Sequence, residues 1–271
     1  MPPQKEKNLT SQIGPAIEVA LDSIALRFGS YGVLTDLSFD IPRGQFVALV
    51  GPTGCGKSSV LNLVAGLLKP SAGSLRTGGR LLDSINRDAA YMLQQDGLLP
   101  WKSVLENVML GPVLRGTSKI QAAKDAKAWI ERVGLRDFES RYPSQLSGGQ
   151  RKRVAMAQAL INRLPILLMD ESFSALDVQT RALMENEFLE LWQELRATVL
   201  FVTHDLEEAI AMADRVLLFT AGPHARLKGD YAVPLPRPRK VEETRFIPGF
   251  AELYETVWRN LKEEVMAAYV R

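Results

Sequence analysis

Apolar and polar residues alternate along the first part of the chain. The segments IEVALDSIALRF (17–28) and VLTDLSFDI (33–41) follow the two-residue period of strands with one buried face. They predict antiparallel strands between about residues 17 and 45. The next run, QFVALV (45–50), is continuously apolar, which is typical of a strand buried on both faces of a sheet.

Helical periodicity follows. SSVLNLVAGLL (58–68) predicts a helix after a glycine-rich turn, and SKIQAAKDAKAWIERV (118–133) predicts an amphipathic helix. The apolar face of that second helix consists of Ala122, Ala126, Trp129, Ile130 and Val133. A further helix follows Asp177, and a last one covers about 249–269. The apolar positions of the helix after Asp177 are Leu183, Met184, Phe188, Leu191, Trp192 and Leu195.

Strand candidates alternate with these helices. They are RDAAYMLQ (87–94), PILLMD (165–170), TVLFVTHD (198–205) and RVLLFT (215–220), with the helix LEEAIAMA (206–213) between the last two. The alternation from 45 to 220 predicts a doubly wound α/β core. We expect a polar, mobile segment at 1–16, a domain at 17–222 and a C-terminal extension at 223–271.

Composition narrows the class of protein. The 271 residues carry a net charge of +2, which indicates neither nucleic acid nor an acidic partner. Apolar runs are far shorter than the ~20 residues of a membrane span. The start, MPPQKEKNLTSQ, lacks the apolar core of a secretory signal, and the single cysteine rules out an internal disulfide. We expect a cytosolic globular protein.

A glycine-rich motif lies between the strand at 45–50 and the helix after it. GPTGCGKSS (51–59) fits G-x-x-x-x-G-K-[ST], in the strand–loop–helix context that this pattern requires. Its glycines let backbone N–H groups point at phosphate oxygens, and the helix start adds its positive end. Lys57 is placed to reach the β- and γ-phosphates, and Ser58 to hold Mg²⁺. We therefore predict nucleoside triphosphate binding rather than an exposed turn. The loop residues are Gly51, Pro52, Thr53, Gly54, Cys55, Gly56, Lys57, Ser58 and Ser59.

Two carboxylates end the strand candidate ILLMDE (166–171). Asp170 can reach the Mg²⁺ shell, and Glu171 is placed to accept a proton from an attacking water. Two carboxylates after a strand are more often a helix cap or a solvated turn. After a phosphate loop, we favour the catalytic interpretation.

A second loop suited to anions begins QLSGGQRKRVAMAQAL (145–160). Ser147, Gly148 and Gly149 offer a hydroxyl and N–H groups at a helix start, although a plain N-cap would account for Ser147 alone. The cap does not explain why one chain contains two phosphate-ready loops.

In this order, the motifs resemble those of the ATP-binding subunits of ABC transporters over about residues 17–222. GPTGCGKSS resembles the Walker A loop, LSGGQ (146–150) the signature, ILLMDE Walker B and SALD (174–177) the D-loop. Gln94 matches the Q-loop glutamine and His204 the switch histidine. Phe28 resembles the aromatic residue that stacks on adenine, with Tyr31 as the alternative.

The resemblance implies an α/β fold with a P-loop NTPase core, in which helices flank a mostly parallel sheet. It adds an N-terminal antiparallel β subdomain and an α-helical signature subdomain inserted at about 96–160. It implies a homodimer with two composite sites for ATP and Mg²⁺, in which Ser147 and Gly149 contact the γ-phosphate held by the second subunit's Lys57. His204 then holds the γ-phosphate and Glu171 in line.

The implied residue sets follow from the matched positions. The catalytic set is Glu171, His204, Gln94 and Lys57, and the Mg²⁺ set is Ser58, Gln94 and Asp170. The nucleotide set adds Phe28, Ser147, Gly148, Gly149, Gln150 and Asp177 to the Walker A loop and Gln94. The sequence departs from the usual family pattern at Ser172, Ser174 and Gln158, where many relatives carry Pro, Gly and Arg. None of these departures removes a catalytic group, so we expect an active ATPase.

The loop segment LLPW (98–101) is unusually apolar. The resemblance implies that it docks one of two membrane permease subunits, with packing beneath the helical region as the alternative. LLPW, and PLPRPR (234–239) in the tail, resemble the ATPases of importers for nitrate, sulfonates, taurine and related solutes. A solvated basic linker would also explain PLPRPR. Such importers use an extracytoplasmic solute-binding protein, and we expect this chain at the cytoplasmic face of a bacterial inner membrane.

Three other functions compete with that of an importer's ATPase subunit. A soluble ABC-type ATPase usually has tandem cassettes, long coiled coils or zinc cysteines, and an exporter's ATPase is usually fused to a membrane domain. A nucleotide-dependent regulator that does not hydrolyse ATP is opposed by Glu171 and His204. Because Cys55 lies in the phosphate loop, we expect thiol alkylation to block ATP binding.

Overall fold

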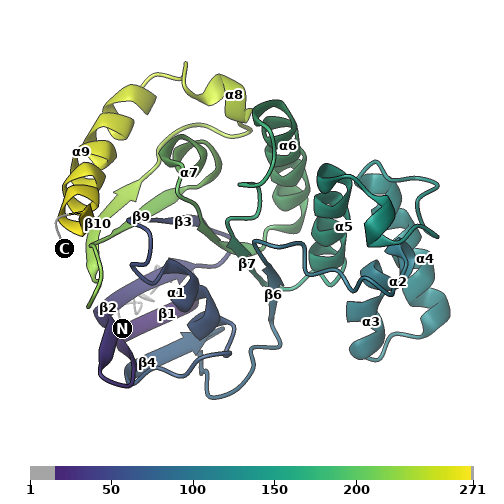
Figure 1. Ribbon diagram of the computed structural model, residues 1–271, viewed down its shortest axis with the longest axis horizontal. Helices are drawn as coiled ribbons and strands as arrows, with labels where there is room; N and C mark the ends of the chain where they lie inside the picture. The colour runs from purple at the N-terminus through teal and green to yellow at the C-terminus, as the bar shows by residue number, and fades with distance from the viewer. Residues whose placement is uncertain (1–15, 270–271) are drawn as a thin grey trace, which may run out of the picture.

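A computed structural model describes residues 16–269 (Figure 1). Almost all of the expected segment 1–16 therefore lies outside the described residues. The first layer is an antiparallel sheet of β1 (Ile17–Phe28), β2 (Tyr31–Pro42), β4 (Ala72–Thr77) and β5 (Arg80–Leu81), in the order β2-β1-β4-β5. The β1–β2 pair is antiparallel, as the alternating pattern predicts.

The second sheet carries the core of the molecule. Its order within the described residues is β10-β9-β3-β8-β7-β6, and the pairs from β9 to β6 are parallel. The strands are β3 (Phe46–Val50), β6 (Ala89–Met92), β7 (Ile166–Asp170), β8 (Thr198–Val202), β9 (Arg215–Phe219) and β10 (Leu227–Ala232). The edge strand β10 runs antiparallel to β9. The α/β class with a mostly parallel sheet is confirmed.

The continuous apolar runs are explained by burial on both faces of this sheet. In β3, Phe46, Ala48 and Val50 belong to one buried cluster, whereas Val47 and Leu49 belong to the other. The second cluster joins the sheet to α1 (Lys57–Val64) and to the antiparallel sheet. The first joins it to α6 (Val178–Leu195), α7 (Leu206–Met212) and the helical lobe defined below.

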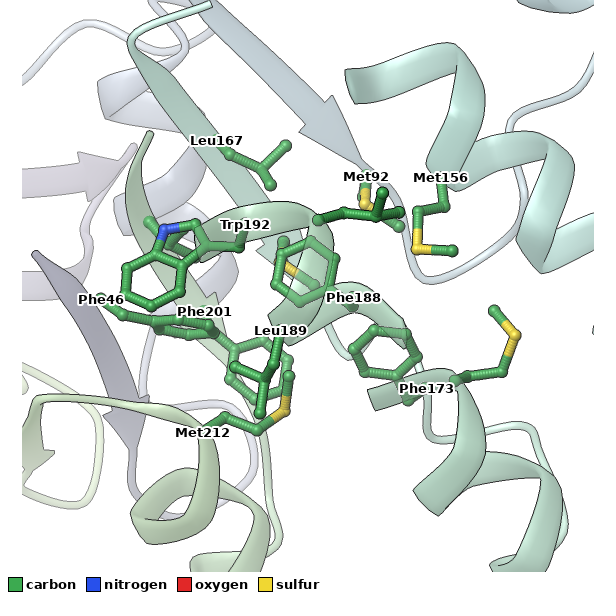
Figure 2. Close-up of a cluster of buried hydrophobic side chains, with 14 of the residues drawn as sticks. Phe46, Met92, Met156, Leu167, Phe173, Phe188, Leu189, Trp192, Phe201 and Met212 are labelled. Atoms are coloured by element: carbon green, nitrogen blue, oxygen red, sulfur yellow. The ribbon is translucent and has the colours of Figure 1, made fainter. Parts of the chain in front are cut away.

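Aromatic side chains fill the space between the sheet and α6 (Figure 2). The Phe46 ring packs edge-on against Trp192 at 5.3 Å between centroids, and against Phe201 at 6.0 Å. Leu183, expected on the apolar face of this helix, is instead 61% exposed. Helical spacing alone does not determine how wide a face the neighbouring elements cover.

A helical lobe projects from the sheet between β6 and β7 (Figure 1). It contains α2 (Val104–Val108), α3 (Leu110–Leu114), α4 (Lys119–Arg132), the short η1 (Pro143–Gln145) and α5 (Gly148–Leu160). The face predicted for the helix at 118–133 is buried at each of its five apolar positions. Within residues 16–269, no helix combines the length and apolarity needed to cross a bilayer.

The helix after the glycine-rich loop is shorter than predicted. It ends at Val64 rather than at residue 68, because Gly66 adopts a left-handed backbone with φ of +70°. The Leu67 N–H then donates to the Asn62 carbonyl and closes the helix end.

The C-terminal extension packs against the same sheet. After β10 come α8 (Val241–Thr244) and α9 (Phe250–Tyr269), and α9 contacts both α7 and β10. The basic segment before α8 is not a solvated linker. Arg237 pairs with Asp214 and lies over the Trp192 ring, while Arg239 is 5% exposed. The alternative of a solvated linker is therefore wrong, because both guanidinium groups have partners in the domain.

Candidate functional site

The glycine-rich loop curls between the end of β3 and the start of α1. Gly54 and Gly56 have φ of +78° and +97°, which side chains with a Cβ rarely adopt. Gly56 is the N-cap of α1 and forms no side-chain cap hydrogen bond, so no side chain competes for the first N–H groups of the helix. The loop is therefore suited to receive an anion from outside the chain.

Lys57 completes this loop. Its side chain is buried, and Nζ donates to the Gly51 carbonyl at 2.8 Å and to the Pro52 carbonyl at 3.0 Å. These contacts hold the ammonium group beside the loop's own backbone. An incoming phosphate would offer Nζ a charged acceptor in place of neutral carbonyls.

Oxygen donors lie at the carboxyl end of β7, next to the loop. The Ser58 hydroxyl donates to Asp170 Oδ1 at 3.0 Å. Burial raises the pKa of Asp170, and its hydrogen bond from Ser58 opposes that effect. Within residues 16–269, no group of three His, Cys, Asp or Glu residues could hold a metal ion. A hydroxyl and one carboxylate fit Mg²⁺ as partial ligands, because this ion is commonly held by few protein groups together with substrate phosphates.

Tyr91, which sequence analysis did not single out, also reaches this carboxylate. Its hydroxyl forms a hydrogen bond with Asp170, and burial together with the Asp170 charge raises the pKa of Tyr91. Tyr91 lies on β6, which pairs with β7 in parallel, so the pairing of strands distant in sequence brings the two together. No local pattern marks the residue.

Glu171 is the residue on which the next two predicted groups converge. Gln94 Nε2 donates to Glu171 Oε2 at 2.9 Å, and His204 Nδ1 lies 3.7 Å from the same oxygen. Glu171 has φ of +43°, a backbone conformation that costs on the order of 1–3 kcal/mol for a residue with a side chain. Its N–H donates to the Val202 carbonyl at 2.9 Å, which helps to hold this conformation.

A cleft of about 410 Å³ opens over these groups. The two candidate aromatic residues, Phe28 at the end of β1 and Tyr31 at the start of β2, both line it and are 53% and 55% exposed. Both rings are thus free to stack on a planar ligand. The cleft is also lined by Val33, Thr53, Gly54, Gly56, Lys57, Ser58, Ser59, Glu171 and His204.

Cys55 differs from its neighbours in the loop. Its side chain is fully buried in the cluster beneath the antiparallel sheet, and burial raises the pKa of its thiol. Only its backbone is therefore available to a ligand. Because the thiol is buried in the core, an alkylating reagent has no direct access to it in the folded protein. The expectation that alkylation blocks ATP binding therefore requires the thiol to become exposed first.

The signature residues do not lie in this cleft. Ser147 is the N-cap of α5, and its hydroxyl accepts a hydrogen bond from the Gln150 N–H at 3.3 Å. Figure 1 shows α5 in the helical lobe, on the opposite side of β7 and β6 from α1. Ser147, Gly148, Gly149 and Gln150 are thus absent from the lining of the cleft over the phosphate loop of their own chain. The cap interpretation and a role toward another molecule are compatible.

Ion pairs, one of them made by a buried lysine, connect the signature helix to the Q-loop. Lys152 is 4% exposed, and its Nζ donates to the Gln94 carbonyl at 2.7 Å and pairs with Asp96 at 3.2 Å. Arg151 pairs with the same carboxylate at 3.0 Å. The sequence does not mark either basic residue as functional, since a lysine and an arginine on a helix resemble any solvated face. The lobe and the Glu171 neighbourhood are therefore tied through Gln94.

The D-loop and the departures from the family pattern have local partners. Asp177 caps α6, accepting from the Thr180 N–H at 3.0 Å. Ser172 is buried and donates to the Met92 carbonyl at 3.4 Å, while the Ser174 hydroxyl donates to the Glu171 carbonyl at 2.9 Å. Gln158 donates to the Asn107 carbonyl at 3.2 Å and joins α5 to α2.

Part of the segment LLPW is packed against the protein, and part of it is exposed as a docking surface would be. Leu98 is half-buried against the main cluster, whereas Trp101 is 69% exposed. The buried Asn107 side chain holds the loop, donating to the carbonyls of Leu99 and Lys102. Packing beneath the lobe thus accounts for Leu98, and leaves the tryptophan facing outward.

A further cleft, about 690 Å³, lies beside the Q-loop between β6, α3 and α5. Exposed apolar side chains, Leu93 and Leu114, line it together with Arg115 and Gln158. LLPW itself does not form its wall, although Asp96 and Gly97, just before that segment, do.

Comparison with known proteins places these features in a family. The family model described as ABC transporter matches residues 34–174. An aliphatic sulfonates import ATP-binding protein of Burkholderia cenocepacia is 46% identical over 252 residues, covering 93% of this chain and 74% of that protein. A putative ATP-binding protein of Brucella abortus biovar 1 is 39% identical over 241 residues, covering 89% and 92%.

A solved structure agrees in fold. A dimeric ATP-binding cassette in a post-hydrolysis state, bound to ADP and Pi, superposes with a TM-score of 0.70 at 29% identity, covering 79% of this chain and 98% of the other. The relatives match nearly the whole chain, and the family model spans the loop, the Q-loop and the signature. The chain therefore belongs to the ABC transporter family, as an ATP-binding subunit that hydrolyses ATP.

Proposed function

We propose that this chain energises a bacterial importer of aliphatic sulfonates or of a related small solute such as nitrate or taurine. The observation that carries the catalytic part is the convergence of Gln94 and His204 on Glu171, beside the phosphate loop. Support for the import part comes from relatives named as sulfonate import ATP-binding proteins, at 46% identity. The solute is selected elsewhere in such an importer.

In this proposal Lys57, the loop N–H groups and one of the two aromatic rings bind ATP. Mg²⁺, held by Ser58, Asp170 and Gln94, neutralises phosphate charge when bound. Glu171 takes the proton of a water that attacks the γ-phosphorus, and the bond to the ADP oxygen breaks. Gln94 and His204 fix the Glu171 carboxylate, so positioning supplies much of the rate enhancement.

The second half of each ATP site comes from a second copy of the chain. Ser147 and Gly149 lie on an exposed helix start that their own phosphate loop does not use. A head-to-tail homodimer would bring them to the partner's γ-phosphate. The dimeric state of a related cassette supports this arrangement.

The membrane partner is proposed to bind beside the Q-loop. An exposed tryptophan and a cleft with exposed leucines in its lining lie at the two ends of residues 93–101, and both suit a short helix of a permease subunit. Gln94 is hydrogen-bonded to Glu171 and, through Lys152, to the signature helix. Docking there would couple the nucleotide to the permease. We accordingly propose peripheral attachment to the cytoplasmic membrane face, with a solute-binding protein outside.

ATP hydrolysis by the wild type and by Glu171→Gln tests this proposal. Because the amide cannot take a proton, kcat should fall by about 10²–10⁴-fold. ATP should still bind, and size-exclusion chromatography with ATP and Mg²⁺ should show the variant as a dimer. Glu190→Gln, an exposed position on α6, is the matched control and should retain wild-type turnover.

Near wild-type turnover of Glu171→Gln would exclude Glu171 as the base. If the wild type itself does not hydrolyse ATP while ATP still binds, the chain needs a docked permease for turnover or acts as a nucleotide-dependent regulator. Addition of permease-containing membranes separates those two results.

A further inference from the structure

Two glutamates meet in the protein interior between α6 and α7. Glu185 is 2% exposed and Glu208 is 8% exposed, and their carboxyl groups form a hydrogen bond with each other. The Thr203 hydroxyl also donates to Glu208 Oε2. Among residues 16–269, Glu185 Oε1 has no hydrogen-bond partner. A hydrogen bond between two carboxyl groups requires a proton on one of them.

The surroundings do not supply enough positive charge for both groups to ionise. Burial, followed by the charge of Glu208, raises the pKa of Glu185 to about 9, against the opposing effect of Arg181. A cavity of about 320 Å³ borders the pair. The other charged groups that line this cavity are Arg181 of α6, Asp205 and Glu207 at the start of α7, and Glu242 and Arg245 at α8. Tyr254 of α9 interacts electrostatically with Glu207 and Asp205.

On one side, the pair is connected to the D-loop. Asp177, Arg181 and Glu185 are spaced by four residues and therefore share one face of α6. Arg181 donates to the carbonyls of Ser174 and Leu176, at 3.3 and 3.0 Å. The first turns of α6 are thus hydrogen-bonded directly to the D-loop.

On the other side, the pair is connected to the switch histidine. Thr203, which donates to Glu208, also accepts from the Asp205 N–H at 3.0 Å. Asp205 caps α7 by accepting from the N–H groups of Glu207 and Glu208. Thr203 and Asp205 flank His204. The Glu208 carboxyl group reaches one side of that residue through the Thr203 hydroxyl, and the Glu208 backbone N–H reaches the other through the Asp205 carboxylate.

We propose that Glu185 and Glu208 share a single proton, and that this pair is a positioning element that ties the D-loop helix α6 to the loop carrying His204. The functional part rests on the role of His204 proposed above. Loss of the shared proton leaves two negative charges in contact. Their repulsion separates α6 from α7 and moves His204 away from Glu171.

The test is the pH dependence of kcat for wild type, Glu185→Gln and the exposed control Glu190→Gln, from about pH 6 to about pH 10. A group with pKa about 9 is about one-tenth protonated one unit above it, so wild-type kcat should fall about tenfold there. The glutamine keeps a donor without a titratable proton, so Glu185→Gln should lack this decline. The control should follow the wild type, with KM for ATP similar in all three proteins.

A spectroscopic readout keeps the test independent of turnover. The infrared carbonyl stretch of a protonated carboxyl group should be present at neutral pH in the wild type and in Glu190→Gln. It should be lost in Glu185→Gln, and a pH titration of the wild type alone should remove it near pH 9. A wild-type band that never titrates there, or equal pH profiles of wild type and Glu185→Gln, would overturn the inference.

The variant His204→Ala distinguishes failure of the proposed role of His204 from failure of the shared-proton inference. If His204→Ala retains full turnover while the titrating band is present, the proposed role of His204 is wrong although the proton is shared. If His204→Ala is inactive and the band is absent, the inference fails and the proposed function stands.

Discussion

At the scale of single residues, burial changes what a motif residue can do. Cys55 and Lys57 are two positions apart in the phosphate loop, and both side chains are buried. The Lys57 ammonium group donates to the loop carbonyls and also contacts the Cys55 sulfur at 3.8 Å, whereas the Cys55 side chain belongs to the apolar cluster. Membership of the motif therefore predicts the role of the lysine, and only the fold shows that the thiol faces away from the cleft.

Cys55 should resist alkylation in the folded protein. Burial blocks access, and the raised pKa leaves less thiolate at neutral pH than an exposed cysteine has. We expect slow labelling by iodoacetamide in buffer, acceleration as pH rises, and rapid labelling in urea, followed by mass spectrometry. The chain has one cysteine, so the label reports this site alone.

Rapid labelling of the folded protein would contradict the burial of the thiol. Molecules that do become labelled should lose ATP binding, since the added group cannot fit beneath the loop. The expectation that alkylation blocks ATP binding thus applies only to molecules in which the phosphate loop has opened enough to expose Cys55.

At the scale of elements, the carbonyl end of α7 depends on a residue far along the chain. Arg239 Nη1 donates to the carbonyls of Ile210, Ala211 and Ala213, and Nη2 to those of Val233 and Leu235. These carbonyls include ones that a helix end leaves without intrahelical donors. Burial, with the nearby Arg237 charge, lowers the pKa of Arg239 to about 10, so the guanidinium stays charged at neutral pH.

Arg239→Ala should destabilise the protein by about 2–4 kcal/mol, because it leaves several buried carbonyls without donors. Urea unfolding of wild type and variant measures this difference. Arg226→Ala, at an exposed position of the same extension, is the control and should change stability by less than about 0.5 kcal/mol. Equal midpoints for wild type and Arg239→Ala would show that the extension does not stabilise α7.

At the scale of the whole molecule, the proposed catalytic and nucleotide-binding groups occupy two separate regions. The cleft with Lys57 and Glu171 lies beside α1, and the signature at the start of α5 lies in the helical lobe (Figure 1). Intramolecular contacts tie the regions together at the Q-loop, through Lys152 and Asp96. One chain would thus contain both halves of the proposed composite site without bringing them together, which favours assembly with a second copy.

Mixing two inactive variants tests this arrangement. Lys57→Ala and Ser147→Arg should each abolish turnover, since each damages both sites of a homodimer. In a mixed dimer both defects fall in one site and the other is intact. Random mixing gives about half mixed dimers, so roughly a quarter of wild-type ATPase activity should return if the sites act independently. Activity no greater than the mean of the separate variants would contradict composite sites.

The sequence by itself determined the elements and motifs that depend on near neighbours. Apolar runs such as ILLMD specify strands buried on both faces, and the glycines of residues 51–56 specify a loop that few other residues could form. Gln94, Glu171 and His204 were identified from the sequence, and the structure brings them within 2.9 and 3.7 Å contacts. Residues that follow different parallel strands can be predicted to lie together, because strand pairing places the carboxyl ends of these strands at one edge of the sheet.

Only the tertiary structure decided which polar groups share an interior. Three sets of contacts join residues that no periodic pattern in the sequence relates to each other. They are the Glu185–Glu208 pair, the Lys152 contacts to the Q-loop and the Arg239 contacts to α7. In the sequence these side chains resemble solvated faces, and the exposed Leu183 resembles a core residue. The physical reason is that burial and hydrogen bonding depend on which surfaces meet, and that is decided by packing between distant segments rather than by local pattern.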